Sequence, residues 1–589
     1  MVGKSTTYTF MSRPDKVPLQ IGAFYVDPSV DEVSRNGAIT KLERRTMQVL
    51  QYLAARSGEV VSVDDLLTGV WADVVVTPDS VYQTISALRR ALGDDPKAPQ
   101  YIVSVPRRGY RMVAPVTTWR PPAAPAVAPA SDANSAPPPA SIAVLPFVDM
   151  SAGKDHEYFA DGISEELIHL LAQVRDLRVP ARTSSFYFKG KSENVAEIAK
   201  KLRVAHVLEG SVRTSARRIR VTAQLILPDS GYHLWSKSYD GDMDDIFKVQ
   251  DEIAAAVVDA MKVRLLPTQQ AVHSRRTANT DAYKEFLLGR RLFLRGHADD
   301  FRRGVDVYRK AIALDPGFAA AYAGLALAEA YLADAVGDMA ARKRAEKAAD
   351  RAVELAPELV DGYAARGTVR FVFGWDWRGA QQDLARALAL EPADSWAQRQ
   401  HGKLCRSLGR MHDAIAAGSK AADLDPLSNF VWEGLGNTYA ASGDLTAARI
   451  AYSNALELEP DSFYATDGLG IVELIEGRAA KALALFGKVD VERSFKLPGT
   501  AMAEHTLGHA KDSRRALDEA IARQAQTGAY DIAAACAWRG EHDQSFQWLE
   551  RAYKQRERGL SEVKIDPLLA GLRGHPRYKA LQKKLNLPE

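Results

Sequence analysis

Donor-bearing side chains recur at helical spacing between residues 78 and 92, and arginines gather again between residues 107 and 111. If the first stretch is a helix, the apolar stripe from Val81 to Leu92 faces a core and the polar residues face outward. The candidate contacts of both stretches are Tyr82, Gln83, Ser86, Arg89, Arg90, Arg107, Arg108 and Arg111. Hydroxyl, amide and guanidinium groups donate hydrogen bonds to phosphate oxygens and to base edges. The pattern predicts a surface that binds double-stranded DNA.

The local charge agrees with a polyanionic partner, whereas the charge of the whole chain is uninformative. The 589 residues carry a formal net charge of only +3. Between Pro78 and Val113, however, six Lys or Arg residues stand against three acids. Neutralising phosphates requires positive charge at the docking surface, so the charge lies where a duplex would bind.

Local signals predict the elements that hold these side chains. Thr77 and Pro78 have the types preferred at a helix N-cap and in its first turn, and Gly93 is suited to end the helix. The runs at 101–105 and 110–113 predict a hairpin with arginines at its tip.

The residues before this helix predict a small sheet and two shorter helices. Residues 19–39 favour short strands, with Asn36-Gly37 as a tight turn. Thr40 to Glu43 and Ser62 to Asp65 each have the pattern of a capping box, in which the first and last side chains satisfy free amide groups at a helix start.

Residues 19–113 resemble the OmpR/PhoB-type winged helix. The resemblance is carried by Thr40-x-x-Glu43, by Val81-x-x-x-Ile85-x-x-Leu88-Arg89 followed by Leu92, and by Gly109-Tyr110-Arg111. It implies that helix 78–92 enters the major groove and that the hairpin reaches the adjacent minor groove. Such domains often bind direct repeats as two copies, so a dimer on DNA is expected from the resemblance. Residues 1–18, expected to be flexible, are too few for a phosphoacceptor receiver.

A spacer and a second domain follow. Residues 114–140 are rich in proline and alanine, which predicts a semi-extended linker. Residues 141–266 mix β-rich runs with amphipathic helices, which predicts an α/β domain. This stretch resembles the TolB-like module through IAVLPF at 142–147, YFADGISEEL at 158–167 and EGSVR at 209–213. The resemblance implies an interaction or sensing role without catalytic residues.

The remainder, residues 280–585, is repetitive. An acidic or alanine residue precedes proline at Pro316, Pro357, Pro392, Pro426 and Pro460, with spacings of 41, 35, 34 and 34 residues. A period near 34 predicts stacked helical pairs, six to eight in number. The repeat ending at Pro460 resembles the tetratricopeptide (TPR) signature through Trp432, Leu435, Gly436, Tyr439, Ala448, Tyr452 and Ala455. Such an array is expected to bind a protein or peptide in its groove.

No motif for catalysis, a cofactor or a metal is found in the sequence. It contains no GxxxxGK[ST] phosphate loop, GxSxG elbow, HExxH or paired CxxC. The acids near His156, namely Glu157, Asp161 and Glu165, are interpreted as the entry of a helix. Cys405 and Cys536 are interpreted as small buried residues. We therefore expect neither an enzyme nor a bound cofactor or metal.

The fold class expected is multidomain, with a winged helix-turn-helix (α+β) head, an α/β middle domain and an all-α TPR superhelix. Without an export signal or a bilayer-spanning run, the protein is predicted to be cytoplasmic and without membrane contact. The leading hypothesis is a one-component transcription regulator that reads promoter DNA, with RNA polymerase as a further candidate partner. The alternative left open is a TPR scaffold whose winged helix contacts protein rather than DNA.

Overall fold

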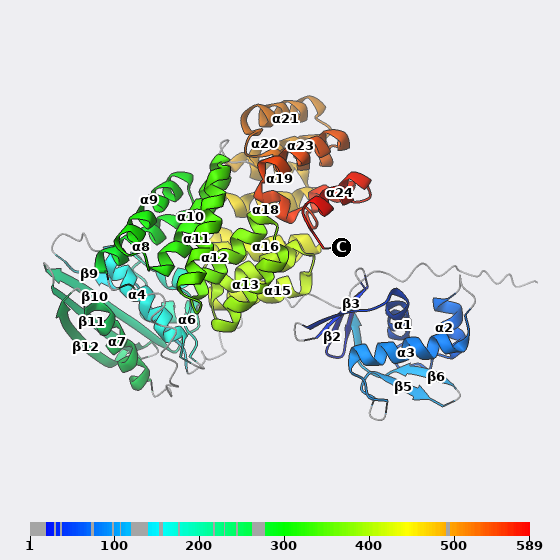
Figure 1. The fold of residues 1–589 in the computed structure, drawn as a ribbon, viewed down its shortest axis with the longest axis horizontal. Helices are drawn as coiled ribbons and strands as arrows, with labels where there is room; N and C mark the ends of the chain where they lie inside the picture. The colour runs from blue at the N-terminus through cyan, green and yellow to red at the C-terminus, as the bar shows by residue number, and fades with distance from the viewer. Residues whose placement is uncertain are drawn as a thin grey trace, which may run out of the picture. The chain divides into compact units, whose positions relative to one another are not determined.

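The computed structural model describes residues 19–28, 31–35, 38–71, 76–96, 99–106, 108–118, 140–151, 157–174, 177–215, 218–228, 230–242, 245–261, 277, 279–489 and 495–588. The chain divides into two compact units, Met1–Pro121 and Pro122–Glu589 (Figure 1). The predicted flexibility of residues 1–18 and most of the predicted spacer at 114–140 lie outside the described residues.

The first unit combines a small sheet with three helices and a separate hairpin. Its antiparallel sheet has the order β4-β3-β2-β1-β7. The strands are β1 Leu19–Ile21, β2 Phe24–Asp27, β3 Glu32–Arg35, β4 Ala38–Lys41 and β7 Val116–Thr118. The helices are α1 Arg44–Ala54, α2 Val63–Val70 and α3 Pro78–Leu92, and the hairpin pairs β5 Ile102–Val105 with β6 Gly109–Met112. One buried core joins sheet, helices and hairpin.

The sequence placed most of these elements correctly, with two differences. The strands on both sides of Asn36-Gly37 are present, although these two residues lie outside the described part. The predicted end of the domain at residue 113 is too early, because β7 completes the sheet by pairing with β1.

The two predicted capping boxes have different outcomes. Ser62 and Asp65 form the box, since each side chain accepts the backbone N–H of the other residue at 3.0 Å. The box at Thr40 is wrong: Thr40 lies in β4, paired with Val33, and α1 begins only at Arg44 with no side-chain cap. Strand pairing satisfies the backbone there, so the hydroxyl is not needed as a cap.

The second unit begins with an α/β part. Its sheet has the order β12-β11-β10-β8, with β9 beside β10; β8 and β9 run parallel to β10, and the longer strands are antiparallel. The strands are β8 Ile142–Val144, β9 Val148–Asp149, β10 His206–Ser215, β11 Arg218–Leu227 and β12 Tyr232–Asp242. The helices are α4 Glu157–Ala172, α5 Arg182–Phe186, α6 Val195–Leu202 and α7 Ile246–Ala260. Helices α4 and α7 cover one face, and α6 packs on the other face beside β8.

Sixteen helices then form eight antiparallel pairs in the described residues, at the upper end of the predicted six to eight (Figure 1). The first four pairs are α8 Thr280–Phe293 with α9 Ala298–Leu314, α10 Ala319–Val336 with α11 Met339–Leu355, α12 Val360–Val369 with α13 Trp377–Leu390, and α14 Ser395–Ser407 with α15 Met411–Leu424. The last four are α16 Asn429–Ser442 with α17 Leu445–Leu458, α18 Phe463–Ile475 with α19 Ala479–Lys488, α20 Lys496–Thr506 with α21 Ala510–Gln524, and α22 Ala529–Trp538 with α23 His542–Gln555. A π turn, η3 Arg370–Gly374, extends α12.

Glycine residues let the helices of neighbouring pairs pack closely around a buried tyrosine. Tyr452 on α17 is buried between Gly436 on α16 and Gly468 on α18. A Cβ at Gly436 would lie 2.7 Å from the Tyr452 ring, and one at Gly468 would lie 2.4 Å away. Any larger residue would force the helices apart, so the glycines of the repeat are steric requirements.

One helix among the described residues, α10, is long and apolar enough to span a membrane. Half of that stretch is buried within the protein, and both α9 and α11 pack against it. Its apolar composition is that of an inner helix of the array.

The α/β part is joined to the repeats through the residues that recur at repeat ends. Asp425, which precedes Pro426, accepts hydrogen bonds from the backbone N–H and the hydroxyl of Ser184 at 2.9 and 2.6 Å. The N–H of Ala181 donates to the carbonyl of Leu424 at 2.8 Å. At the first pair, the buried carboxylate of Glu165 on α4 forms ion pairs with Arg182 and with Arg290 on α8. The acid of the recurring motif therefore anchors the neighbouring domain.

Candidate nucleic-acid interface

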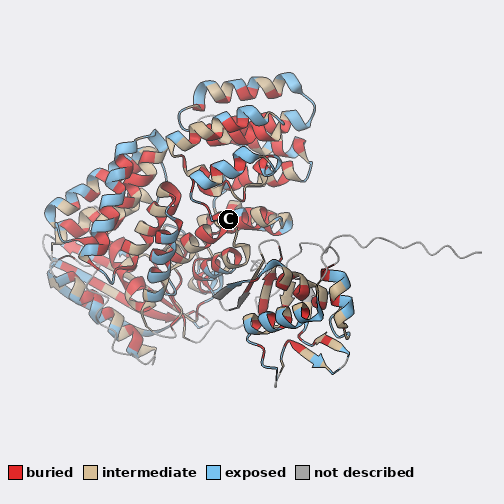
Figure 2. Ribbon diagram, turned by 45° about the vertical axis from the view of Figure 1, so that its right-hand side comes forward, coloured by how far each residue is buried: buried red, intermediate tan, exposed pale blue. Residues whose placement is uncertain are grey.

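Helix α3 is formed and oriented by the predicted signals. Pro78 occupies the first turn, and Gly93 ends the helix in the left-handed conformation at φ 61°. Val81, Ile85, Leu88 and Leu92 are at most 1% exposed, which confirms the predicted stripe. With one side fixed against the core, the opposite side of α3 is presented to solvent, and Figure 2 colours exposed positions along it pale blue.

Four of the predicted contacts lie on this exposed side. Tyr82 is 47% exposed, and Gln83, Ser86 and Arg90 are exposed as well. The Ser86 hydroxyl donates to the carbonyl of Tyr82 at 2.8 Å, so its proton is engaged within the helix. Its oxygen can still accept a hydrogen bond. The free donors of the face are therefore the Tyr82 hydroxyl, the Gln83 amide and the Arg90 guanidinium.

Arg89 differs from its prediction. Its side chain is only 14% exposed and is turned toward the hairpin rather than outward. The guanidinium donates to the carbonyl of Ile102 at 2.9 Å and to the hydroxyl of Ser104 at 3.1 Å. The apolar period shows only that Arg89 lies beside the buried stripe, and the acceptors on β5 decide which way its long side chain turns. Arg89 therefore positions α3 against β5.

The hairpin is fastened at the residues that carried the family resemblance. The backbone groups of Val61 and Tyr110 exchange hydrogen bonds of 2.8 and 2.9 Å. Gly109 has φ 122°, and a Cβ there would lie 2.0 Å from the Val61 carbonyl oxygen. Only glycine fits this approach.

The three arginines of the hairpin have different surroundings. Arg108 is exposed, Arg111 is partly buried, and Arg107 lies outside the described residues. The Nε of Arg111 is buried and has no hydrogen-bond partner in the part of the chain that the structure describes. Of the two that the structure describes, Arg108 is the more exposed arginine.

Sequence reasoning missed Asp94, which organises the connection between α3 and the hairpin. This 5% exposed carboxylate accepts the backbone N–H groups of Gln100, Tyr101 and Ile102 at 2.6, 3.0 and 2.9 Å. The available signal was an aspartate directly after the helix-ending Gly93, a position where a carboxylate often binds nearby amides. Asp94 and Arg89 together fix the position of α3 relative to β5.

The inner face of the repeats, the predicted partner site, is occupied by the end of the chain. Beyond α23, the segment 556–588 contains the 3-10 turns η4 Arg558–Glu562 and η5 Pro567–Leu572 and helix α24 Pro576–Lys584. Glu557 accepts the N–H groups of Ala529 and Tyr530 at the start of α22, while Arg558 pairs with Asp334 on α10 at 3.2 Å. Glu557 and Arg558 thus bridge the eighth pair and the second pair. The first helices of these two pairs, α22 and α10, face one another across this segment.

A buried ion pair holds the same segment to the middle of the array. Arg406 on α14, with its side chain 7% exposed, binds both carboxylate oxygens of Glu562 at 2.9 and 3.0 Å. Burial opposes ionisation of Glu562, but Arg406 and Lys403 outweigh it and lower the pKa of the carboxyl. The side chains of Leu560, Val563, Leu569 and Leu572 are fully buried. The groove predicted for a peptide partner is filled by this chain.

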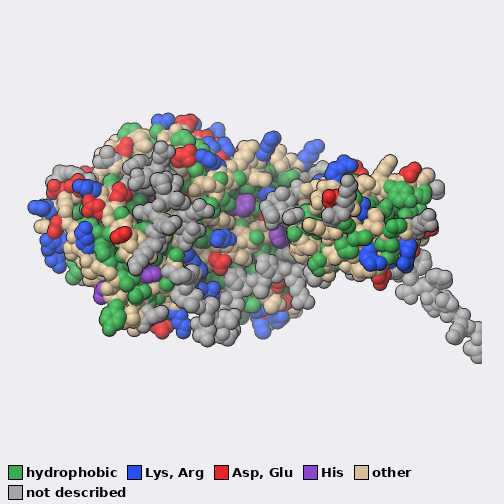
Figure 3. Space-filling model, turned by 90° about the horizontal axis from the view of Figure 1, so that it is seen from below, with side chains coloured by type: hydrophobic (Ala, Val, Ile, Leu, Met, Phe, Trp, Pro, Cys, Tyr) green, Lys and Arg blue, Asp and Glu red, His purple; other side chains and the backbone are tan. Residues whose placement is uncertain are grey.

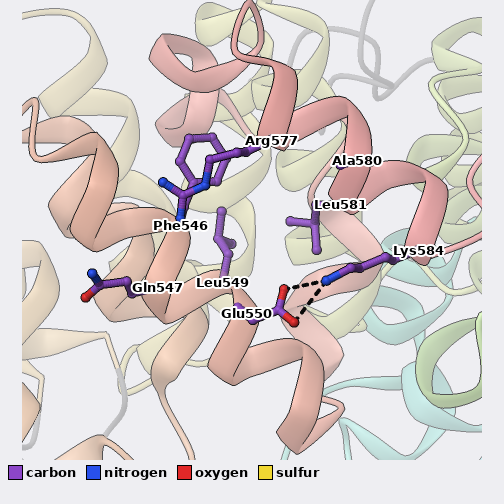
Figure 4. Close-up of a pocket in the computed structure, with 8 residues that line it drawn as sticks. All are labelled: Phe546, Gln547, Leu549, Glu550, Arg577, Ala580, Leu581 and Lys584. Atoms are coloured by element: carbon purple, nitrogen blue, oxygen red, sulfur yellow. Dashed lines mark hydrogen bonds and ion pairs between the residues drawn. The ribbon is translucent and has the colours of Figure 1, made fainter.

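A pocket of about 470 Å³ opens between α23 and α24 (Figure 4). Phe546, Leu549 and Leu581 make its wall apolar. Its charged groups are engaged, since Lys584 pairs with Glu550 at 2.8 Å and Arg577 lies 4.5 Å from the centre of the Phe546 ring.

The other titratable residues are explained by ion pairs or by burial, except for one surface cluster to which no role is assigned. Glu157 and Asp161 are paired with Lys189, while His156 lies outside the described residues. Burial raises the pKa of Cys405 and Cys536 to about 12 each, in agreement with small buried core residues. Glu504, His509 and Asp512 bring ligand atoms within 4.8 Å of one another at the surface, and we assign them no metal.

Comparison with known proteins identifies two of the parts. A family model described as "Transcriptional regulatory protein, C terminal" matches residues 37–112. Residues 37–112 are a winged-helix domain of this regulator type. A second model, "Tetratricopeptide repeat", matches residues 431–462, the stretch containing the best predicted repeat.

Relatives share only a part of this chain. A protein of Rhizobium meliloti named putative adenylate cyclase 3 is 41% identical over 188 residues, which are 32% of each protein. The transcriptional activator CadC of Escherichia coli is 39% identical over 129 residues, 20% of this chain and 25% of CadC. The solved DNA-binding domain of E. coli CadC is 40% identical, with 18% of this chain and 97% of that domain covered and a TM-score of 0.17. The matched stretches span a quarter to a third of the two relatives' own length.

Proposed function

We propose that the protein is a DNA-binding transcription regulator that uses α3 for the major groove and the β5-β6 hairpin for the adjacent minor groove. The observation that carries the proposal is the exposed donor face of Tyr82, Gln83 and Arg90 on a helix fixed to the hairpin by Arg89 and Asp94. This rigid pairing supports simultaneous contact with base edges and phosphates. Ser86, Arg107, Arg108 and Arg111 complete the proposed contact set.

The charge of the second unit supports the same assignment. On the face seen in Figure 3, basic and acidic side chains of residues 122–589 alternate rather than gather into one basic patch. A sequence-independent attraction to DNA requires clustered positive charge. This face of residues 122–589 therefore shows no single basic patch for DNA.

The role proposed for residues 122–589 is to receive a signal or recruit protein from the cytoplasm, through surfaces other than the filled inner face. The α/β part is proposed to be TolB-like, and RNA polymerase remains a candidate partner. We propose binding rather than catalysis, because the acids of α4 are neutralised by Lys189, Arg182 and Arg290.

The test is fluorescence anisotropy of residues 1–121, which form a compact unit with their own core, against the gene's upstream DNA and a random duplex at several salt concentrations. Tighter binding to the upstream DNA with a steep salt dependence is expected. Absence of binding at low salt would favour the scaffold alternative.

Arg90→Ala sharpens that test. Loss of one phosphate contact should weaken binding several-fold and reduce the salt slope by about 0.9. Arg56→Ala is the matched control, because Arg56 is a partly exposed arginine next to the end of α1, where it stacks on Tyr52. Equal effects of both substitutions would contradict a specific role of α3.

A further inference from the structure

Helix α14 carries a line of three cations on the inner side of the repeat array. Arg399, Lys403 and Arg406 follow one another at steps of four and three residues, which places them on one side of the helix. Arg406 binds Glu562 of the segment 556–588, so this side faces inward. We call these three residues the inner cations.

Of the inner cations, only Arg406 is paired with an acid in the part of the chain that the structure describes. Neither Arg399 nor Lys403 has an ion pair or donates a hydrogen bond among these residues. Their contacts are with aromatic rings: the Arg399 guanidinium lies 5.1 Å from the centre of the Trp396 ring, and the Lys403 ammonium lies 5.9 Å from that of Phe371. The N–H groups of both cations therefore still lack an acceptor oxygen.

Positive charge is left over around Lys403. Burial and the charges of three neighbouring arginines outweigh the charge of Glu562 and lower the pKa of Lys403 to about 8. The arginines are Arg406, Arg558 and Arg399. The first two are each paired with an acid of their own, so the excess charge lies on Arg399 and Lys403.

Glu433 on α16 does not supply the missing negative charge. Burial, only partly opposed by Ser462 and Arg399, raises the pKa of Glu433 to about 7. Its carboxylate accepts a hydrogen bond from the Ser462 hydroxyl and forms no ion pair with Arg399 among the described residues. At neutral pH Glu433 is therefore charged about half of the time, against two cations.

The two unpaired cations are accessible and lie beside another unsatisfied donor. Arg399 and Lys403 are partly exposed, and the side chain of Arg558 is 38% exposed, so residues 556–588 do not cover the pair completely. The Nε1–H group of Trp396, one turn before Arg399, is buried and has no acceptor in the described part of the chain. An unsatisfied buried donor costs free energy, which an acceptor oxygen of a ligand would recover.

We propose that Arg399 and Lys403 bind a small molecule with two negative charges, carried either on one phosphate group or on two carboxylates. Four residues of helix separate the two cations by about 6 Å along its axis, a distance that long side chains close around one phosphate and that a short dicarboxylate spans. Arginine binds such oxygens through two N–H groups at once, and lysine binds them as a point charge. A small ligand is favoured over an acidic peptide because residues 556–588 already occupy the neighbouring inner face. The site does not depend on DNA binding.

Isothermal titration calorimetry of the full-length protein at low salt tests the site. Succinate and inorganic phosphate are the two probes, and the tighter one shows whether the site takes two carboxylates or one phosphate. That probe should bind with a dissociation constant below about 1 mM, and acetate, with a single charge, should bind at least about tenfold more weakly. Absence of binding by both probes, or acetate binding as tightly as either, would overturn the proposal.

Substitutions locate the binding. Arg399→Gln and Lys403→Gln should each raise the dissociation constant of the tighter probe at least about tenfold. Lys420→Gln is the matched control, because Lys420 is an exposed lysine on α15, and it should leave the constant unchanged. The same probe should raise the urea midpoint of the wild-type protein and of Lys420→Gln, but not that of the other two variants. Equal binding by all the proteins, or equal weakening in all three variants, would contradict a site at Arg399 and Lys403.

Discussion

The sequence pattern predicts one binding surface on helix α3 and another on the inner face of the repeat array, which is formed by the first helix of each pair. In the structure, only the surface on α3 is exposed. Its polar side has no covering segment among the described residues of the first unit, whereas residues 556–588 return over the inner face of the array. The contrast shows what periodicity reports. It identifies the apolar face of a helix, but a segment about 150 residues further along the chain can still cover the opposite face, as Glu562 does at Arg406.

Arg406→Ala should have the largest effect, because it breaks the buried pair that holds the returning segment. Leaving Glu562 without its cation is expected to cost about 3 to 5 kcal/mol of unfolding free energy. Urea denaturation of the full-length protein, followed by circular dichroism, measures it. Lys584→Ala removes a cation from the exposed pair with Glu550 and should cost less than about 1 kcal/mol. Equal losses in the two variants would mean that the segment does not hold the array.

The pKa of Asp467 on α18 tests whether water is excluded from the space between the first helices of successive pairs. Burial, followed by the charge of Asp531 on α22, raises the pKa of Asp467 to about 8. The folded protein therefore holds a proton that the unfolded chain, with a pKa of about 3.9, releases earlier. Its contribution to stability is complete below about pH 4 and is lost as the pH rises to about 8.

Asp467→Asn cannot ionise and should remove this dependence. Relative to wild type, the variant is expected to gain stability by about 1.4 kcal/mol for each pH unit between about pH 4 and pH 8. Denaturation midpoints of both proteins at the two pH values measure the gain. A constant difference would show that water reaches Asp467.

Arg89→Ala should separate positioning from DNA contact on α3. Losing the hydrogen bonds to Ile102 and Ser104 is expected to destabilise residues 1–121 by about 1.5 kcal/mol. Arg90→Ala, at an exposed position, should change stability by less than about 0.5 kcal/mol while weakening DNA binding. Thermal unfolding compares the melting temperatures of the two variants. Similar values would contradict the role of Arg89 in positioning α3 against β5.

The smallest effect is expected from the two capping boxes. Ser62→Ala should cost about 1 kcal/mol, because the N–H of Asp65 loses its acceptor. Thr40→Ala should cost less than about 0.5 kcal/mol, since Thr40 is an exposed strand residue. Thermal unfolding of residues 1–121 checks both, and the reverse order would mean that the N-terminal box forms in solution.

Features encoded by neighbouring residues were predictable from the sequence. The buried stripe of α3, the Ser62 box, the hairpin and the helical pairs each depend on residues within about one repeat of one another. Thr40 was misassigned because strand pairing competes with capping for the same backbone groups. The direction of Arg89 and the role of Asp94 depend on acceptors and donors 6 to 15 residues away, which no helical period reports.

The contacts between distant parts of the chain were not predictable in this way. Nothing in the spacing of the recurring acids shows that Asp425 binds Ser184, 241 residues earlier. The closing of the array by Glu557 and Arg558 requires its curvature, which arises only when all the pairs have stacked.

The bridge from α10 to α22 also has a consequence for synthesis on the ribosome. The residues Glu557, Arg558 and Glu562 follow all eight helical pairs in the sequence, so the pairs are synthesised before the segment that holds them together. A polypeptide released early, just after α23, would carry Arg406 without its acid and an uncovered apolar lining. Such products should be recognised by chaperones and proteases, so a stable repeat array requires the synthesis of residues 556–588.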